Sequence, residues 1–82
     1  MIKLSENRVA LMNLKFTINA LDELNILIKY YSEDKLGPAY CTFRHTDTGE
    51  FDVQIDRKIM LPALQAQRQV LIDYLSTLGI EV

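Results

Sequence analysis

Cysteine and histidine are nearly absent from this sequence, which has one of each, Cys41 and His45. A single cysteine excludes a disulfide within the chain, and one residue of each type cannot complete a closed zinc site without several carboxylates. The two residues are four apart on one predicted strand, so they share a face but lie about 13 Å apart along it. That separation is too long for a nucleophile–base hydrogen bond. We expect Cys41 to be a small core residue and His45 to be a partly exposed turn residue.

Glycine is also scarce, and this limits the chemistry that the chain can support. Its three glycines all fall at predicted turns or helix ends, which leaves none to cradle phosphates. The sequence contains no phosphate-binding loop, dinucleotide fingerprint, metal-ligand spacing or catalytic triad. We therefore expect no cofactor, no metal and no enzymatic activity.

The chain has neither a strong excess of one charge nor a long apolar run. Nine basic and eleven acidic residues are interspersed and give a net charge of −2. This balance argues against a nucleic-acid partner, which would favour a basic excess. No apolar stretch approaches the ~18 residues of a membrane span, and the first residues do not have the pattern of a signal peptide. The expectation is a cytoplasmic protein with no membrane partner.

The size of the chain and its apolar content together favour self-association. With 82 residues, we expect one domain over 1–82. A domain of this size buries only about 60% of its unfolded surface and often needs a disulfide, a metal or a partner chain. Because the first two are not expected here and 49% of the residues are apolar, we predict a homodimer or a higher even assembly.

A long amphipathic helix is predicted from Ser5 to about Ser32, since apolar residues recur at spacings of three and four without an intervening Gly or Pro. The residues 14–19 also alternate strictly between apolar and polar, which is a strand pattern. A kinked long helix and a strand followed by a helix therefore both remain open for this stretch. Gly37 and Pro38 then predict a break in the chain.

A β-hairpin is predicted next. Two alternating runs flank Thr46-Asp47-Thr48-Gly49, which has the composition of a turn. Either plausible register places Arg44 opposite a carboxylate, Glu50 or Asp52. The apolar face of the hairpin carries Phe43, Phe51 and Val53, and we expect the helices to cover it.

A second amphipathic helix closes the chain. We place Pro62 in its first turn, where a missing N–H has no cost, and Gly79 at its end, with Ile80 packing back on the last turn. The predicted fold class is α+β, in the order helix, hairpin, helix (α-β-β-α).

The first helix is the expected oligomer interface. It is apolar on more than one face, because Phe16 and other apolar residues lie off the main stripe. Such a helix usually has two contacts, here its own hairpin and closing helix on one side and a second subunit on the other. A polar residue on the stripe, Asn25, resembles the residues that fix register in helix–helix interfaces. The predicted interface residues are Leu14, Ile18, Leu21, Asn25, Ile28 and Tyr31. A four-stranded sheet formed across a two-fold axis is the second route to a dimer.

One group of basic and aromatic residues predicts a different function, the binding of a small anion. Tyr40 and Arg44 share the polar face of the hairpin, and Arg57 and Lys58 lie at its far end. Such a group suits a small anionic ligand such as a nucleotide. Acidic residues crowd the same face and weaken this interpretation.

The hairpin segment Phe43-Arg44-His45-Thr46-Asp47-Thr48-Gly49-Glu50-Phe51 and the closing segment Leu61-Pro62-Ala63-Leu64 to Leu78-Gly79-Ile80 resemble small uncharacterised proteins of phages and prophages. The resemblance covers roughly the second half of the chain. It implies an accessory protein that binds or inhibits a host protein, or one that captures a small host signal. Our leading hypothesis is a non-enzymatic, oligomeric protein-interaction module with an unidentified protein partner, and the alternative is a protein that binds or sequesters a small nucleotide-like anion.

Overall fold

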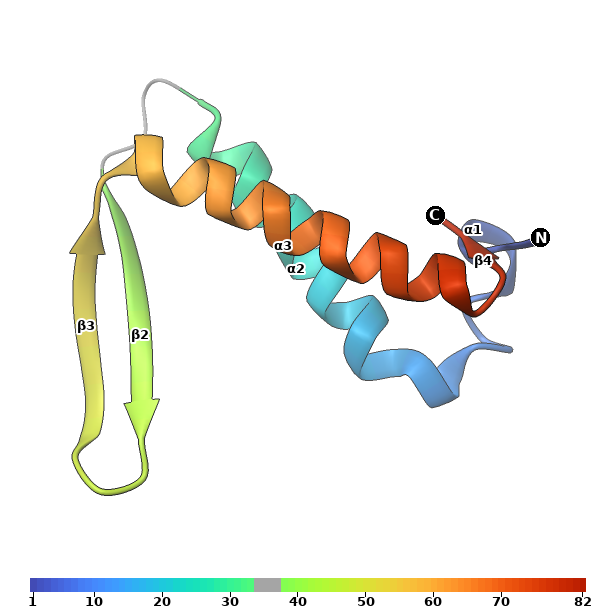
Figure 1. The fold of residues 1–82 in the computed structure, drawn as a ribbon, viewed down its shortest axis with the longest axis horizontal. Coiled ribbons are helices and arrows are strands. Elements are labelled where there is room, and N and C mark those ends of the chain that lie inside the picture. The colour runs from blue at the N-terminus through green and yellow to red at the C-terminus, as the bar shows by residue number, and fades with distance from the viewer. Residues whose placement is uncertain (34–37) are drawn as a thin grey trace.

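The computed structural model describes residues 1–33 and 38–82 and confirms the α+β class. Two long helices lie side by side and a hairpin extends from one end of the pair (Figure 1). The predicted break at Gly37 lies outside the described residues. In chain order the elements are β1 (Ile2–Lys3), α1 (Leu4–Asn7), the 3₁₀ turn η1 (Met12–Leu14), α2 (Lys15–Tyr31), β2 (Ala39–His45), β3 (Gly49–Ile55), α3 (Arg57–Thr77) and β4 (Ile80–Glu81).

The first helical segment is divided, not continuous. It begins at Leu4 rather than Ser5, leaves the helical path after Asn7, and resumes through η1 into α2. The strand alternative for residues 14–19 is wrong, because α2 starts at Lys15. Packing explains the division. Leu4 and Leu14 both contact one core cluster, whereas a straight helix would separate them by about 15 Å.

The core lies between α2, α3 and the two ends of the chain. Leu21 and Leu75 are its most buried large side chains, and Leu4, Ile18 and Ile80 complete the buried cluster. The expectation for the end of α3 is confirmed. Gly79 adopts a positive φ of 77°, which glycine does without steric cost, and Ile80 turns back into the core.

A short parallel pair of strands, β1 and β4, joins the two ends of the chain. Ile2 pairs with Ile80, and the Ile2 N–H donates to the Gly79 carbonyl over 2.9 Å. The sequence reasoning missed this pair, since two-residue strands have too few positions to show alternation. The only signal was an isoleucine near each end of the chain.

Helix α3 begins earlier than predicted. The Asp56 side chain accepts a hydrogen bond from the Lys58 N–H over 2.8 Å and caps the helix at Arg57. Pro62 consequently lies inside the helix rather than in its first turn. Its ring nitrogen cannot donate to the Lys58 carbonyl, so this turn lacks one helical hydrogen bond.

The hairpin has the predicted strands, turn and ion pair. Gly49 adopts a positive φ of 89°, and Arg44 pairs with Glu50, with 2.9 Å between Nε and Oε1. The hairpin formed by β2 and β3, which we call the arm, points away from the helices (Figure 1). Phe43 and Phe51 on this arm are exposed. The expectation that the helices cover its apolar face is therefore wrong for most of its length.

Candidate interaction surface

The first uncovered surface is the apolar side of the hairpin, which we call the hairpin face: Cys41, Phe43, Phe51 and Val53. Cys41 is paired with Val53 and Phe43 with Phe51, and alternation along each strand puts all four on one side. Burial falls from base to tip. Ala39 at the base is buried, Cys41 is half-buried, and Phe43 and Phe51 are 54% and 52% exposed.

The base of the hairpin face contacts α3. The Cys41 Sγ lies 3.9 Å from the Met60 Sδ, and Met60 is buried. Cys41 is thus a half-buried packing residue at the base of the hairpin, outside the core cluster in which it was expected. His45 lies at the far end of the strand, where its Nδ1 accepts from the Asp47 N–H over 3.2 Å. The structure does not bring these two residues together.

The second uncovered surface runs along α2, opposite its packed side, and we call it the outer α2 face: Phe16, Ile26, Leu27 and Tyr30. These residues recur at helical spacings and project away from the buried Ile18 and Leu21. Phe16 is 80% exposed and Tyr30 is 55% exposed. The structure thus places Phe16 off the packed stripe, as the sequence predicted.

The outer α2 face is not flat. A hollow of about 470 Å³ is lined by Ile26, Lys29, Tyr30 and Glu33. At the other end of the helix, the Lys15 ammonium lies 5.3 Å from the centre of the Phe16 ring. The face therefore combines an exposed aromatic residue at each end with a hollow beside one of them.

Two of the six residues predicted as the oligomer interface are buried within the chain. Ile18 and Leu21 are buried in the core, and Leu14 packs against them. Ile28 and Tyr31 are half-buried farther along α2. Two of the six are therefore covered by the chain's own elements and are not exposed to a second copy.

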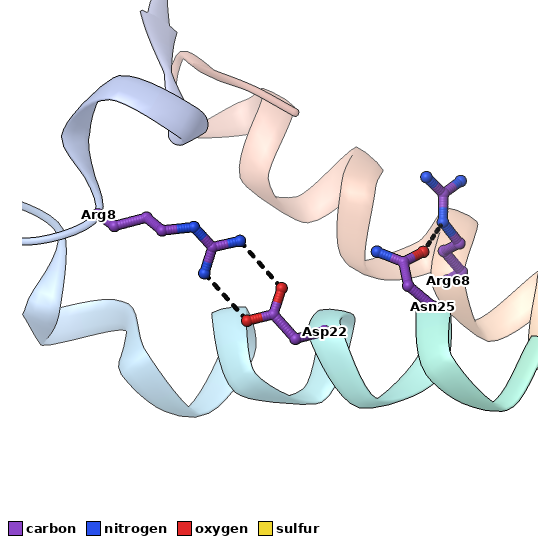
Figure 2. A network of polar contacts seen from close by, with 4 residues as sticks. All are labelled: Arg8, Asp22, Asn25 and Arg68. Atoms are coloured by element: carbon purple, nitrogen blue, oxygen red, sulfur yellow. Dashed lines mark hydrogen bonds and ion pairs between the residues drawn. The ribbon is translucent and has the colours of Figure 1, made fainter.

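Asn25, the sixth predicted interface residue, bonds to α3. The Arg68 Nε donates to the Asn25 Oδ1 over 2.5 Å (Figure 2). A directional contact of this kind holds one helix at a defined position along the other. The sequence indicated a register role for Asn25, and the structure assigns its contact to the packing of α2 on α3 within the chain.

A second polar contact fixes the segment between α1 and α2. The two Arg8 guanidinium nitrogens Nη1 and Nη2 each lie 2.9 Å from an Asp22 carboxylate oxygen (Figure 2). The hydrogen bond from Arg8 lowers the pKa of Asp22 below its usual value and outweighs a small opposing effect of burial. Asp22 is therefore a structural anchor for the turn that precedes α2.

The structure does not gather the predicted anion-binding residues into one site. Tyr40 and Arg44 share the polar face of the hairpin, but they are four residues apart, about 13 Å, and Arg44 pairs with Glu50. Arg57 and Lys58 line a separate hollow of about 240 Å³ with Tyr31, Ser32 and Leu61. The Arg57 Nη1 donates to the Glu33 carbonyl over 2.6 Å.

Residues 1–33 and 38–82 contain no group of three or more His, Cys, Asp or Glu side chains that could hold a metal ion. Within the same ranges, no helix combines the length and the apolar character needed to cross a bilayer.

The chain exposes more surface than a compact protein of its mass. Its accessible area is 6278 Å², whereas a folded monomer of 9.5 kDa is expected to expose about 5000 Å². Its radius of gyration is 15.1 Å, against about 12 Å for a compact chain of this length. The accessible area thus exceeds the expected value by about 1200 Å².

No protein-family model matches this chain, and no match to a curated protein or a solved structure was found.

Proposed function

We propose that this protein is a non-enzymatic protein-interaction module whose working form is a homo-oligomer. The observation that carries the proposal is the excess exposed surface, which coincides with two apolar faces. The excess per chain is comparable to the ~800 Å² that each partner buries in a stable protein–protein interface.

The composition of these faces supports the same function. Each contains two aromatic residues, Phe43 and Phe51 on the hairpin and Phe16 and Tyr30 on α2. Aromatic residues are enriched where protein partners bind. The largest exposed apolar patch on a soluble monomer, typically a few hundred Å², is often functional.

Three of the polar contacts serve the architecture. Arg8 holds Asp22, Arg68 holds Asn25, and Asp56 caps α3. These contacts join one element to another or close the end of a helix. They support a scaffold that presents surfaces to a partner.

Light scattering coupled to size-exclusion chromatography tests the proposal. Elution volume alone is unsuitable, because an extended monomer elutes early. We expect a scattering mass of at least twice 9.5 kDa at tens of micromolar protein, falling on dilution. A mass of one chain at every concentration up to several hundred micromolar would overturn the proposal.

A further inference from the structure

Building on the proposed function, we propose that two copies of this chain dock reciprocally. The hairpin face of each copy packs on the outer α2 face of the other, around a two-fold axis. Such an arrangement is closed, because every contact between a hairpin and a helix occurs twice. The partner that completes each apolar face is thus a second copy of the same chain.

The available area decides against pairing of the two hairpin faces alone. Each phenylalanine exposes about half of the ~200 Å² that such a side chain can bury, so Phe43 and Phe51 offer about 200 Å² together. Val53 raises the total for the hairpin face to roughly 300 Å². A stable interface needs about 800 Å² per partner, so a second surface on each chain must take part.

The outer α2 face supplies an area of similar size. Phe16, at 80% exposure, and Tyr30, at 55%, add roughly 250 Å². Ile26 and Leu27 enlarge the apolar surface beside Tyr30, and the exposed Asn19 and Glu23 lie on the same side of the helix between Phe16 and Ile26. The helix rises about 21 Å from Phe16 to Tyr30, and the strand from Ala39 to His45 spans about 20 Å. The whole arm is therefore as long as the outer α2 face, and the four residues of the hairpin face occupy about 7 Å of that length.

The hollow on α2 gives this docking a specific feature. Its volume of about 470 Å³ is ample for a phenylalanine side chain. Phe43 and Phe51 are both exposed on the part of the hairpin that extends away from α3, so either could enter a hollow on another chain. Ile26 and Tyr30 provide apolar walls, and Lys29 and Glu33 provide a polar rim. An aromatic anchor in a pocket with a polar rim is the usual centre of a protein interface.

Pairing of the hairpin edges of two copies would leave the apolar faces exposed. A four-stranded sheet formed from two hairpins would pair the open edges, but it would double the uncovered apolar face. Reciprocal docking covers the hairpin face and the outer α2 face together, so it removes more apolar surface from water.

Cross-linking between two engineered cysteines tests the arrangement. In a Cys41→Ala background, one chain carries Val53→Cys on the hairpin face and the other carries Leu27→Cys on the outer α2 face. A short bismaleimide should join the two chains when they are mixed. A Gln54→Cys chain is the matched control, because residue 54 lies on the opposite face of the same strand.

The outcomes separate this inference from the function on which it rests. Rapid coupling of Val53→Cys to Leu27→Cys, with slow coupling of Gln54→Cys, supports reciprocal docking. Faster coupling of Val53→Cys to itself overturns it in favour of paired hairpins. No coupling in a dimeric protein also overturns it but leaves the proposed function standing, whereas a monomeric wild-type chain removes both.

A pair of single variants provides a second test. We expect Phe43→Ser and Phe16→Ser each to weaken dimerisation at least about tenfold, since each removes an aromatic contact twice. Tyr40→Ser is the control for the hairpin, because Tyr40 is 64% exposed on the polar face, and it should change the dissociation constant less than about twofold. All three positions are exposed, so circular dichroism should show an unchanged fold. Equal effects of Phe43→Ser and Tyr40→Ser would contradict the docking.

Discussion

The helical half of the molecule and the hairpin arm are both amphipathic, yet only one of them buries its apolar side. Leu21 and Leu75 are almost completely buried between α2 and α3, whereas Phe43 and Phe51 remain half exposed on the arm. The two regions differ in burial because they differ in the elements that pack against them. Each long helix has the other beside it, but the arm leaves the helix pair after its base (Figure 1).

A hydrophobic pattern therefore identifies an apolar surface that is to be buried. It does not identify the element or chain that buries it. A two-stranded hairpin is only marginally stable by itself in water. In this chain its base is anchored by the buried Ala39 and by the Cys41–Met60 contact. We therefore expect the two regions to respond differently to equivalent substitutions.

The largest difference is expected between truncated side chains in the two regions. Leu75→Ala removes a buried side chain from the core and should lower the free energy of unfolding by about 2–5 kcal/mol. Val53→Ala, on the exposed part of the arm, should change the stability of the monomer by less than about 0.5 kcal/mol. Urea denaturation of dilute protein measures both values. Similar losses at the two positions would mean that the arm belongs to the same packed unit as the helices.

The two glycines with positive φ offer a matched comparison of backbone strain. Gly79 ends α3 and Gly49 ends the hairpin turn, and an added Cβ would meet no atom within 4 Å at either position. Alanine therefore introduces the strain of the left-handed conformation, about 1–2 kcal/mol. We expect Gly79→Ala to lower the global free energy of unfolding by that amount, because the turn at Gly79 directs Ile80 into the core.

Gly49→Ala should act locally instead. It should speed hydrogen exchange of the amides in β2 and β3 and leave those in α2 and α3 unchanged. Exchange measured on dilute protein by mass spectrometry distinguishes the two responses. Equal loosening of the helices by Gly49→Ala would show that the arm and the helices unfold together.

A smaller effect is expected from the polar contacts of each region. Arg68→Met removes the donor to Asn25 while keeping an apolar stem, and should cost about 1 kcal/mol in thermal unfolding. Arg44→Met removes the exposed pair with Glu50 and should leave the melting temperature within experimental error. The reverse order would contradict the register role of the Asn25–Arg68 contact.

The smallest effect concerns acid. The pKa of Asp22 is lower in the folded chain than in the unfolded chain, because the folded state gives it the Arg8 hydrogen bond. This contribution to stability is therefore present above the unfolded pKa, near 4, and is lost as the pH falls through the folded value. Melting curves recorded from pH 6 downward should show an extra loss in the wild type compared with Asp22→Asn. Parallel curves would argue against the contact in solution.

The local elements follow from the amino-acid pattern alone. Alternation and the Thr46–Gly49 turn specified the hairpin and placed Arg44 opposite Glu50 or Asp52, and the structure selects Glu50. Helical periodicity with Gly79 specified α3 and its end. Periodicity also identified α2 as apolar on two faces. These features depend on residues close in the chain, so a local pattern contains the necessary information.

Which apolar surfaces are covered depends on the packing of elements that are far apart in the chain. The stripe through Ile18 and Leu21, which the sequence offered to a second chain, is occupied by α3, and the hairpin face assigned to the helices is exposed. The division of the first helix and the pairing of Ile2 with Ile80 likewise depend on residues far apart in sequence. Such contacts are selected by the packing of whole elements, because an apolar side chain has no directional preference that would reveal its partner in advance.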